Sequence, residues 1–241
     1  MPDVLTEISG IAFNQGDPDL LYAEQDEDGV LFAIKPGSTD SKQTRFGSGG
    51  DYEDIAITNG IVIMLRSDGT FFTFPLADTK NAEVKSKKQK DLLPAGEYEG
   101  MYADKDGSVY ALCKHCGIEK TSKTTTVFTL KLTAEGMLST AEQNTIDVKK
   151  IEQLTGTKKI SFHPSALAKN PQTNEWYILS SVNKLLVVAD SSWNIKAAYP
   201  LNPSIFGQPE GMAFDRDNNL YISNEGDKLR PGNVLKFIFK K

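Results

Sequence analysis

The chain has 241 residues, enough for one sizeable core, and its 39% hydrophobic and 24% charged residues are ordinary for a globular domain. Its net charge of −5 argues against a nucleic-acid partner, because no basic field is available to neutralise phosphates. No apolar run approaches the roughly 20 residues that span a bilayer, so we expect no transmembrane segment.

A short pattern recurs five times along the chain: Ser or Glu, then a mostly small residue, then Ile, Met or Leu, and usually Ala. The first residues of the five copies, called anchors below, are Ser9, Glu53, Glu99, Ser165 and Glu210. Their separations are 44, 46, 66 and 45 residues. Three intervals agree closely and one carries about 20 extra residues, which indicates five repeats of one structural unit.

Each anchor is followed by a polar turn, a β-rich run, another turn and a third apolar run. The second runs span 20–24, 61–65, 109–113, 176–180 and 220–224, and the third span 30–34, 70–74, 127–132, 184–189 and 234–239. A weaker fourth strand precedes the next anchor, as at 194–201. Four antiparallel strands per period predict an all-β fold, a five-bladed β-propeller that occupies residues 1–241 as one domain. A β-sandwich is the alternative.

The residue after each anchor is expected on the innermost strand, where the blades converge and little room exists for a side chain. These residues are Gly10, Asp54, Gly100, Ala166 and Gly211. Asp54 departs from the pattern and brings a carboxylate near the axis. The next residues would plug the gaps between neighbouring blades. They are Ile11, Ile55, Met101, Leu167 and Met212.

The long third interval predicts an insertion at about 114–162. Residues 117–126 have the composition of a long polar hairpin loop, and residues at about 148–155 favour a short helix. Such an insertion often shapes a binding face, because loops on a rigid scaffold carry function.

The five anchors, with HPSALAKNPQTNEWYILSS at 163–181 and QPEGMAFDRDNNLYISNEG at 208–226, resemble the SdiA-regulated family of bacterial propellers. The resemblance covers residues 7–239 and implies an NHL-like, five-bladed propeller. It also implies an exported or envelope protein, periplasmic or extracytoplasmic, with a calcium site as in some members. It implies no particular activity.

The first repeat has only eight residues before its anchor, Ser9. We expect either that the last blade lacks a closing strand or that Met1–Thr6 partly supplies it. We also expect that an upstream segment with an export signal has been removed.

The anchors should form a ring at one mouth of the channel, because equivalent repeat positions lie at one height around the axis. Glutamates, backbone carbonyls and water form a hard-oxygen environment that suits Ca²⁺. We therefore predict a Ca²⁺ site with Glu53, Glu99 and Glu210 as ligands; without a cation their pKa values should rise. The alternative is structural, with the glutamates accepting hydrogen bonds from neighbouring blades.

Two further sets of polar residues should open toward the same face. Two residues before the anchors stand Glu7, Asp51, Glu97, His163 and Gln208. The ends of the second strands add Glu24, Ser67, Ser180, Asn224 and Glu225.

The segment CKHC at 113–116 admits several interpretations. A structural zinc site needs four ligands, and His163 is the only histidine besides His115. A redox C-x-x-C motif would open a helix, whereas this one ends a predicted strand. A local disulfide is an alternative, and two free thiols, Cys113 and Cys116, are the state that we favour.

His163 and Ser165 are two residues apart and would share one face of a strand, but no nucleophile elbow accompanies them. We therefore expect an exported propeller that binds a small molecule or protein partner, with Ca²⁺ at its channel. The alternative is a metal-dependent hydrolase of the phosphoesterase or lactonase type that uses the channel carboxylates.

Overall fold

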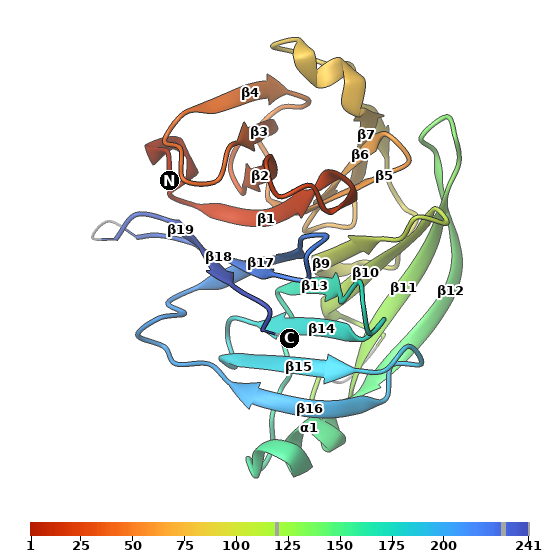
Figure 1. The fold of residues 1–241 in the computed structure, drawn as a ribbon. Helices are drawn as coiled ribbons and strands as arrows, with labels where there is room; N and C mark the ends of the chain where they lie inside the picture. The colour runs from red at the N-terminus through yellow and green to blue at the C-terminus, as the bar shows by residue number, and fades with distance from the viewer. Residues whose placement is uncertain (119–120, 228–229, 241) are drawn as a thin grey trace.

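The computed structural model describes residues 1–118, 121–227 and 230–240, which form five antiparallel sheets in chain order (Figure 1). The first sheet contains β1 (Ile8–Phe13), β2 (Leu21–Gln25), β3 (Val30–Ile34) and β4 (Ser41–Arg45). The second contains β5 (Tyr52–Thr58), β6 (Ile61–Arg66), β7 (Phe71–Pro75) and β8 (Lys87–Gln89). The third contains β9 (Gly96–Ala103), β10 (Ser108–Cys116), β11 (Thr124–Leu132) and β12 (Leu138–Asp147).

The fourth sheet contains β13 (Ala166–Lys169), β14 (Trp176–Ser180), β15 (Leu185–Ala189) and β16 (Ile195–Pro200). The last contains β17 (Pro209–Phe214), β18 (Leu220–Asn224) and β19 (Asn233–Phe237). Short 3-10 helices occupy η1 (Asp3–Leu5), η2 (Asn14–Gly16) and η3 (Leu76–Lys80). The predicted five-bladed β-propeller is confirmed, with the difference that the last blade has three strands within the described residues.

The ring closes between the first and last blades, where β1 and β17 lie side by side in Figure 1. The Ser223 hydroxyl on β18 donates to the Ser9 carbonyl at 2.7 Å, and the Arg216 N–H donates to the Gly16 carbonyl at 2.8 Å. Residues before β1 form η1 and add no strand to the last blade. The expectation of a missing closing strand is therefore confirmed for the described part of the chain.

The small residues on the innermost strands are there because neighbouring blades almost touch. A Cβ atom on Gly211 would lie 2.3 Å from the Ser9 carbonyl oxygen, and one on Gly100 would lie 2.9 Å from the Ala166 carbonyl carbon. Both distances are too short for a real side chain. The predicted reason for the small residues is confirmed.

The outer edge of the third and fourth blades is covered by the helix α1 (Val148–Thr155), which lies beyond β16 at the bottom of Figure 1. The Asp147 side chain caps it by accepting the Lys149 N–H at 2.9 Å, and Gly156 ends it with φ 70°. Val148 and Ile151 bury its apolar face in the core. The helix predicted at about 148–155 is confirmed.

The loop predicted at 117–126 is shorter than expected. Residues 124–126 already belong to β11, because threonines suit a strand as well as a loop. Residues 119–120 of that prediction lie outside the described part of the chain. Within the described residues, no helix is long and apolar enough to cross a membrane.

Candidate functional site

Four of the five anchors lie where the innermost strand falls out of register with its neighbour. The pairing of β5 with β6 shifts between Tyr52 and Asp54, and that of β17 with β18 shifts between Pro209 and Gly211. Similar shifts occur around the anchors of β1 and β9. A β-bulge leaves its extra residue unpaired and re-aims its side chain. The bulges therefore free Glu53 and Glu210 from the regular alternation of the strand.

The two serine anchors have a structural role between blades. The Ser9 hydroxyl donates to the Glu53 carbonyl at 3.0 Å, and the Ser165 hydroxyl donates to the Pro209 carbonyl at 3.0 Å. Each bond joins one innermost strand to the next blade. The hydroxyls are thus occupied by the scaffold, and the three glutamates carry the chemistry of this ring.

Lys114 on β10 lies among the three glutamate anchors. Its ammonium group forms an ion pair with the buried Glu99 carboxylate. Burial lowers the pKa of Lys114, but the hydrogen bond to Glu99 and the charges of Glu99, Glu53 and Glu210 outweigh it, and the pKa is raised. One internal cation therefore interacts with all three carboxyl groups.

The glutamate anchors hold protons more tightly than free carboxyl groups. Burial, followed by the charges of Glu99 and Asp51, raises the pKa of Glu53 to about 10. Burial and then the charge of Glu99 raise the pKa of Glu210 to about 8. Burial also raises the pKa of Glu99, although its bond with Lys114 acts in the opposite direction. The pKa of each glutamate anchor is raised, as expected, but burial is a larger cause than the predicted repulsion.

Glu24 at the end of β2 extends the acidic region toward the first blade. One carboxylate oxygen accepts the Gly10 N–H at 2.6 Å, while the buried Oε2 has no hydrogen-bond partner among the described residues. Burial is the largest cause that raises the pKa of Glu24 to about 8, and the charges of Asp26 and Asp51 add to it. The missing partner makes Glu24 Oε2 a point where a cation or water would be stabilised.

Asp26 and Glu225 continue this region across the seam between the first and last blades. Burial, then the charges of Glu7 and Glu27, raise the pKa of Asp26 to about 6, and its buried Oδ1 lacks a partner within the described chain. Burial, then the charges of Asp26 and Glu7, raise the pKa of Glu225 to about 7. Mutual repulsion therefore links carboxyl groups of different blades.

We call these residues the acidic end of the channel. Its six carboxyl groups with raised pKa belong to Glu24, Asp26, Glu53, Glu99, Glu210 and Glu225, and Lys114 is its internal cation.

Asp54 takes a structural position between the second and third blades. Its carboxylate accepts the Met101 N–H at 2.5 Å and its own neighbour's N–H, from Ile55, at 2.8 Å. Burial raises the pKa of Asp54 well above its usual range against both of these bonds. Asp54 therefore has a structural role, in which its carboxylate accepts a hydrogen bond from the neighbouring blade.

The other face-lining candidates are held by local bonds. The Asp51 carboxylate accepts the Ser67 hydroxyl, and the Gln208 side-chain amide donates to Glu225. The Asn224 side chain donates to Asn233 at 3.1 Å. These contacts fix the loops around the mouth. The charge of Glu97 raises the pKa of Glu99.

His163 and Ser165 do not form a catalytic pair with each other in the described hydrogen bonds. The His163 N–H donates to Asn183 at 3.1 Å, and its carbonyl accepts the Ser180 hydroxyl at 2.6 Å. The Ser165 hydroxyl is committed to Pro209. The segment therefore anchors a blade entry loop.

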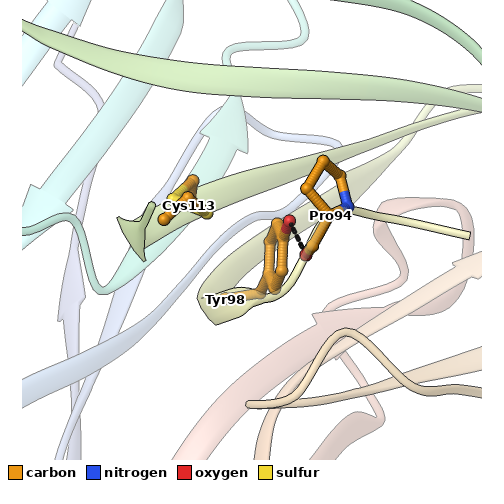
Figure 2. The surroundings of a disulfide bond; sticks show 4 residues. Pro94, Tyr98 and Cys113 are labelled. Atoms are coloured by element: carbon orange, nitrogen blue, oxygen red, sulfur yellow. Dashed lines mark hydrogen bonds between the residues drawn. A yellow bond between two sulfur atoms is a disulfide. The ribbon is translucent and has the colours of Figure 1, made fainter. Parts of the chain in front are cut away.

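Cys113 and Cys116 form a disulfide, so the favoured state of two free thiols is wrong (Figure 2). Residues three apart on a regular strand face opposite sides. Two register shifts between β9 and β10, around Cys113 and His115, remove that regularity and let the sulfur atoms meet. Beside the bridge, the Tyr98 hydroxyl donates to the Pro94 carbonyl at 2.7 Å. The disulfide encloses Lys114 in its short loop.

Lys114 and Asp26 are functional candidates that no sequence motif marks. Lys114 lies between Cys113 and Cys116, and the C-x-x-C spacing suggests a role for the cysteines and none for the lysine. Aligning the second strands by their pairing partners puts Lys114 in line with Asp26 and Glu225. That alignment is the signal by which the sequence would have revealed both residues.

The donor atoms of the acidic end bear on metal binding. Within the described residues, no three His, Cys, Asp or Glu side chains are already arranged to hold a metal ion. The oxygen donors and the two carboxylate oxygens without partners fit a hard cation such as Ca²⁺. Lys114 occupies part of that environment, so an ion would have to displace its ammonium group.

A family model for the SdiA-regulated proteins matches residues 2–229. The chain belongs to the SdiA-regulated family. The resemblance read from the five anchors is thereby confirmed. No curated protein matches the chain by sequence.

Solved propellers share the fold of this SdiA-regulated protein at low sequence identity. Glutaminyl cyclase from Myxococcus xanthus is 13% identical with a TM-score of 0.63, covering 97% of this chain and 92% of its own. The calcium-binding protein regucalcin from Agrobacterium tumefaciens is 12% identical with a TM-score of 0.55, covering 95% and 89%. A chain of the nidogen/laminin complex is 12% identical with a TM-score of 0.55, covering 90% and 72%. These similarities concern the fold alone.

Proposed function

We propose that this protein is an exported propeller that binds a cation at the acidic end of its channel and, through it, a ligand or partner. The observation that carries the proposal is the set of six carboxyl groups with raised pKa, three of which interact with Lys114. Each pKa is raised because burial and like charges disfavour the ionised form. A bound cation removes that cost.

Ca²⁺ is the cation that we favour. It accepts six to eight oxygen ligands in flexible geometry, which suits carboxylates on different blades better than the strict octahedron of Mg²⁺. We propose Glu53, Glu99 and Glu210 as its ligands. The calcium-binding regucalcin has a similar fold, which adds support.

Lys114 would compete with Ca²⁺ for the same carboxyl groups. In the absence of an ion, its ammonium group pairs with Glu99 and lies in the field of Glu53 and Glu210. Binding of Ca²⁺ would release Lys114 from Glu99. The lysine therefore sets how tightly the acidic end holds an ion, and keeps the region folded without one.

The disulfide supports the proposed location outside the cytoplasm. Disulfides persist in oxidising compartments and are uncommon in the cytosol of most organisms. Cys113 and Cys116 are both buried and joined to each other. Thiol alkylation of the protein from intact cells, carried out without and with a reductant, would check this. We expect Cys113 and Cys116 to be labelled, once the protein is unfolded, only in the reduced sample. Labelling of these cysteines in the sample without reductant would contradict export.

Thermal unfolding tests the proposed cation site. Ca²⁺ binds only the folded chain in this account, so excess Ca²⁺ should raise the midpoint above its value in EDTA, with a smaller rise for Mg²⁺. Glu210→Gln should reduce the rise. Glu142→Gln, at an exposed carboxylate on β12, is the matched control and should respond as the wild type does. An unchanged midpoint in millimolar Ca²⁺ would refute the proposal.

A hydrolase is the second candidate, and one observation favours it. With pKa values of about 10 and about 8, Glu53 and Glu210 keep a proton near neutral pH, beside the charged Lys114. A protonated carboxyl group can act as a general acid toward an ester or lactone oxygen. A panel of phosphate esters and lactones, assayed with the wild type and Glu210→Gln, separates the candidates. Turnover lost in the variant supports an enzyme, and no turnover supports a binding protein.

A further inference from the structure

The end of the channel opposite the acidic end contains a cavity of about 610 Å³. It is lined by the C-terminal ends of the innermost strands and by the loops that follow them. Its inner wall includes the five plug residues, which come from one position of each repeat: Ile11, Ile55, Met101, Leu167 and Met212. A cavity of this size lies within the range of small-molecule sites. We call it the apolar cavity.

The wall of the apolar cavity is hydrophobic and well supported. Phe13 packs edge-on against Tyr221 with ring centroids 4.8 Å apart, and Phe214 packs edge-on against Tyr177 at 5.0 Å. Ile57 adds a branched side chain. Rings held by such contacts keep a preformed surface, so a ligand's apolar body would be buried without first ordering the wall.

The charged residues of the lining are mostly cationic, in contrast to the overall charge of −5. Lys105, Lys169 and Arg216 come from three consecutive blades. The one lining carboxylate is Asp215, which is buried and accepts bonds from Asn219 at 2.8 Å and from Tyr221 at 3.2 Å. It is thus directed into its own blade.

The neighbouring carboxylates neutralise these cations only in part. Asp104 holds Lys169 at 2.7 Å, and the exposed Asp17 lies 3.8 Å from Arg216. Within the described residues, no carboxylate forms an ion pair with the Lys105 ammonium group, although the Lys105 N–H donates to Asp104 at 2.8 Å. Positive charge therefore remains at the edge of an apolar pocket.

We propose that the apolar cavity binds an amphipathic anion, a carboxylate on an apolar chain such as a medium-chain fatty acid. The chain would lie against Phe13, Phe214 and the plug residues, and the carboxylate would face Lys105 and Arg216. This goes beyond the proposed cation site, because it concerns the other end of the channel and a ligand of opposite charge. An uncharged alcohol would lack the charge-assisted bonds, and a strongly hydrated small anion would lack the apolar contact.

Calorimetric titration with decanoate, below its aggregation concentration, tests the proposal on the full chain. We expect one decanoate per chain, and binding about tenfold weaker for decanol and for the double variant Lys105→Gln/Arg216→Gln. Glu142→Gln, at an exposed carboxylate on β12 outside the cavity lining, is the control and should bind as the wild type does. No binding by the folded wild type, or equal binding by decanol and by the double variant, would overturn the proposal.

Methionine methyl NMR locates the ligand without any substitution. The chain has five methionines, of which Met101 and Met212 line the apolar cavity, while Met137 is exposed and lies outside the lining. Decanoate should shift the Met101 and Met212 signals and leave that of Met137 in place. Shifts at Met137 without shifts at Met101 and Met212 would mean surface association and would overturn the proposal.

Discussion

The two ends of the channel are built from the same five strands and have opposite characters. At the N-terminal ends of the innermost strands, buried and partly buried carboxyl groups gather around Lys114. At the C-terminal ends, an apolar cavity is bordered by Lys105, Lys169 and Arg216. The plug residues lie between these ends. The innermost strand of each repeat therefore contributes to two different sites, because its N-terminal end lies at the acidic end of the channel and its C-terminal end lies at the apolar cavity.

The two ends of the channel also differ in whether their polar side chains form hydrogen bonds that hold neighbouring blades together. At the acidic end, Asp54 and the Ser9 hydroxyl bond the backbone of the neighbouring blade. At the cavity end, Lys105 has a surface side chain whose ammonium group has no ion pair within the described residues. Substitution of Asp54 or Ser9 should therefore lower stability, whereas substitution of Lys105 should affect ligand binding and leave stability nearly unchanged.

The largest expected effect follows from Asp54→Ala. The change leaves the buried Met101 and Ile55 N–H groups without their acceptor, which should cost about 2–4 kcal/mol of unfolding free energy. Lys105→Ala at the cavity end should change it by less than about 0.5 kcal/mol. Urea denaturation of both variants measures the difference. Equal stabilities would break the contrast between the ends.

The pH dependence of stability should come from the acidic end. The folded pKa of Glu210 is about 8, above its ordinary 4.5, so the folded chain retains a proton that the unfolded chain releases. Stability in EDTA should therefore be greatest at about pH 4.5 and fall by roughly 1–3 kcal/mol as pH rises to about 8.

Glu210→Gln should weaken this dependence, because the other carboxyl groups with raised pKa remain, and Lys105→Gln should leave it unchanged. Urea denaturation across that pH range provides the measurement. Stability that rises with pH throughout the range would contradict the assignment of these pKa shifts.

A smaller effect is expected from Lys114→Met, which removes the internal cation and keeps the apolar part of the side chain. Glu99 loses its ion pair, so the variant should be less stable in EDTA, and more so at pH 8 than at pH 5. Its Ca²⁺ affinity should rise by about tenfold, because no ammonium group must be displaced. Weaker Ca²⁺ binding by the variant would mean that Lys114 supports the site instead of competing for it.

Much of the fold was predictable because the five repeats are recognisable in the amino-acid sequence. Ser or Glu followed by a small residue marks each innermost strand, and the contacts of Gly100 and Gly211 show why only a small residue fits. The helix Val148–Thr155 was equally readable from its pattern and cap. The count of residues before Ser9 left two outcomes, a last blade without its closing strand or one partly supplied by Met1–Thr6, and the described residues show the first.

The site was predictable only in part. The repeated anchor positions identified the glutamates. Whether a glutamate side chain departs from the alternating directions of a regular strand depends on β-bulges, which arise where the innermost strand pairs with the second strand. The same irregularity joins Cys113 to Cys116 and was not visible in a C-x-x-C spacing. The role of Lys114 arises from its ion pair with Glu99 on another strand, so no local sequence motif could predict it.

Calorimetric titration of Ca²⁺ near neutral pH is the most direct measurement of the cation site. We expect one Ca²⁺ per wild-type chain, loss of the binding heat in Glu53→Gln/Glu99→Gln/Glu210→Gln, and full retention in Lys105→Gln/Arg216→Gln. The triple variant should remain folded, since neutral side chains carry neither the burial cost nor the repulsion that raise these pKa values. No heat from the wild type, or undiminished heat from the folded triple variant, would contradict a cation site at the acidic end.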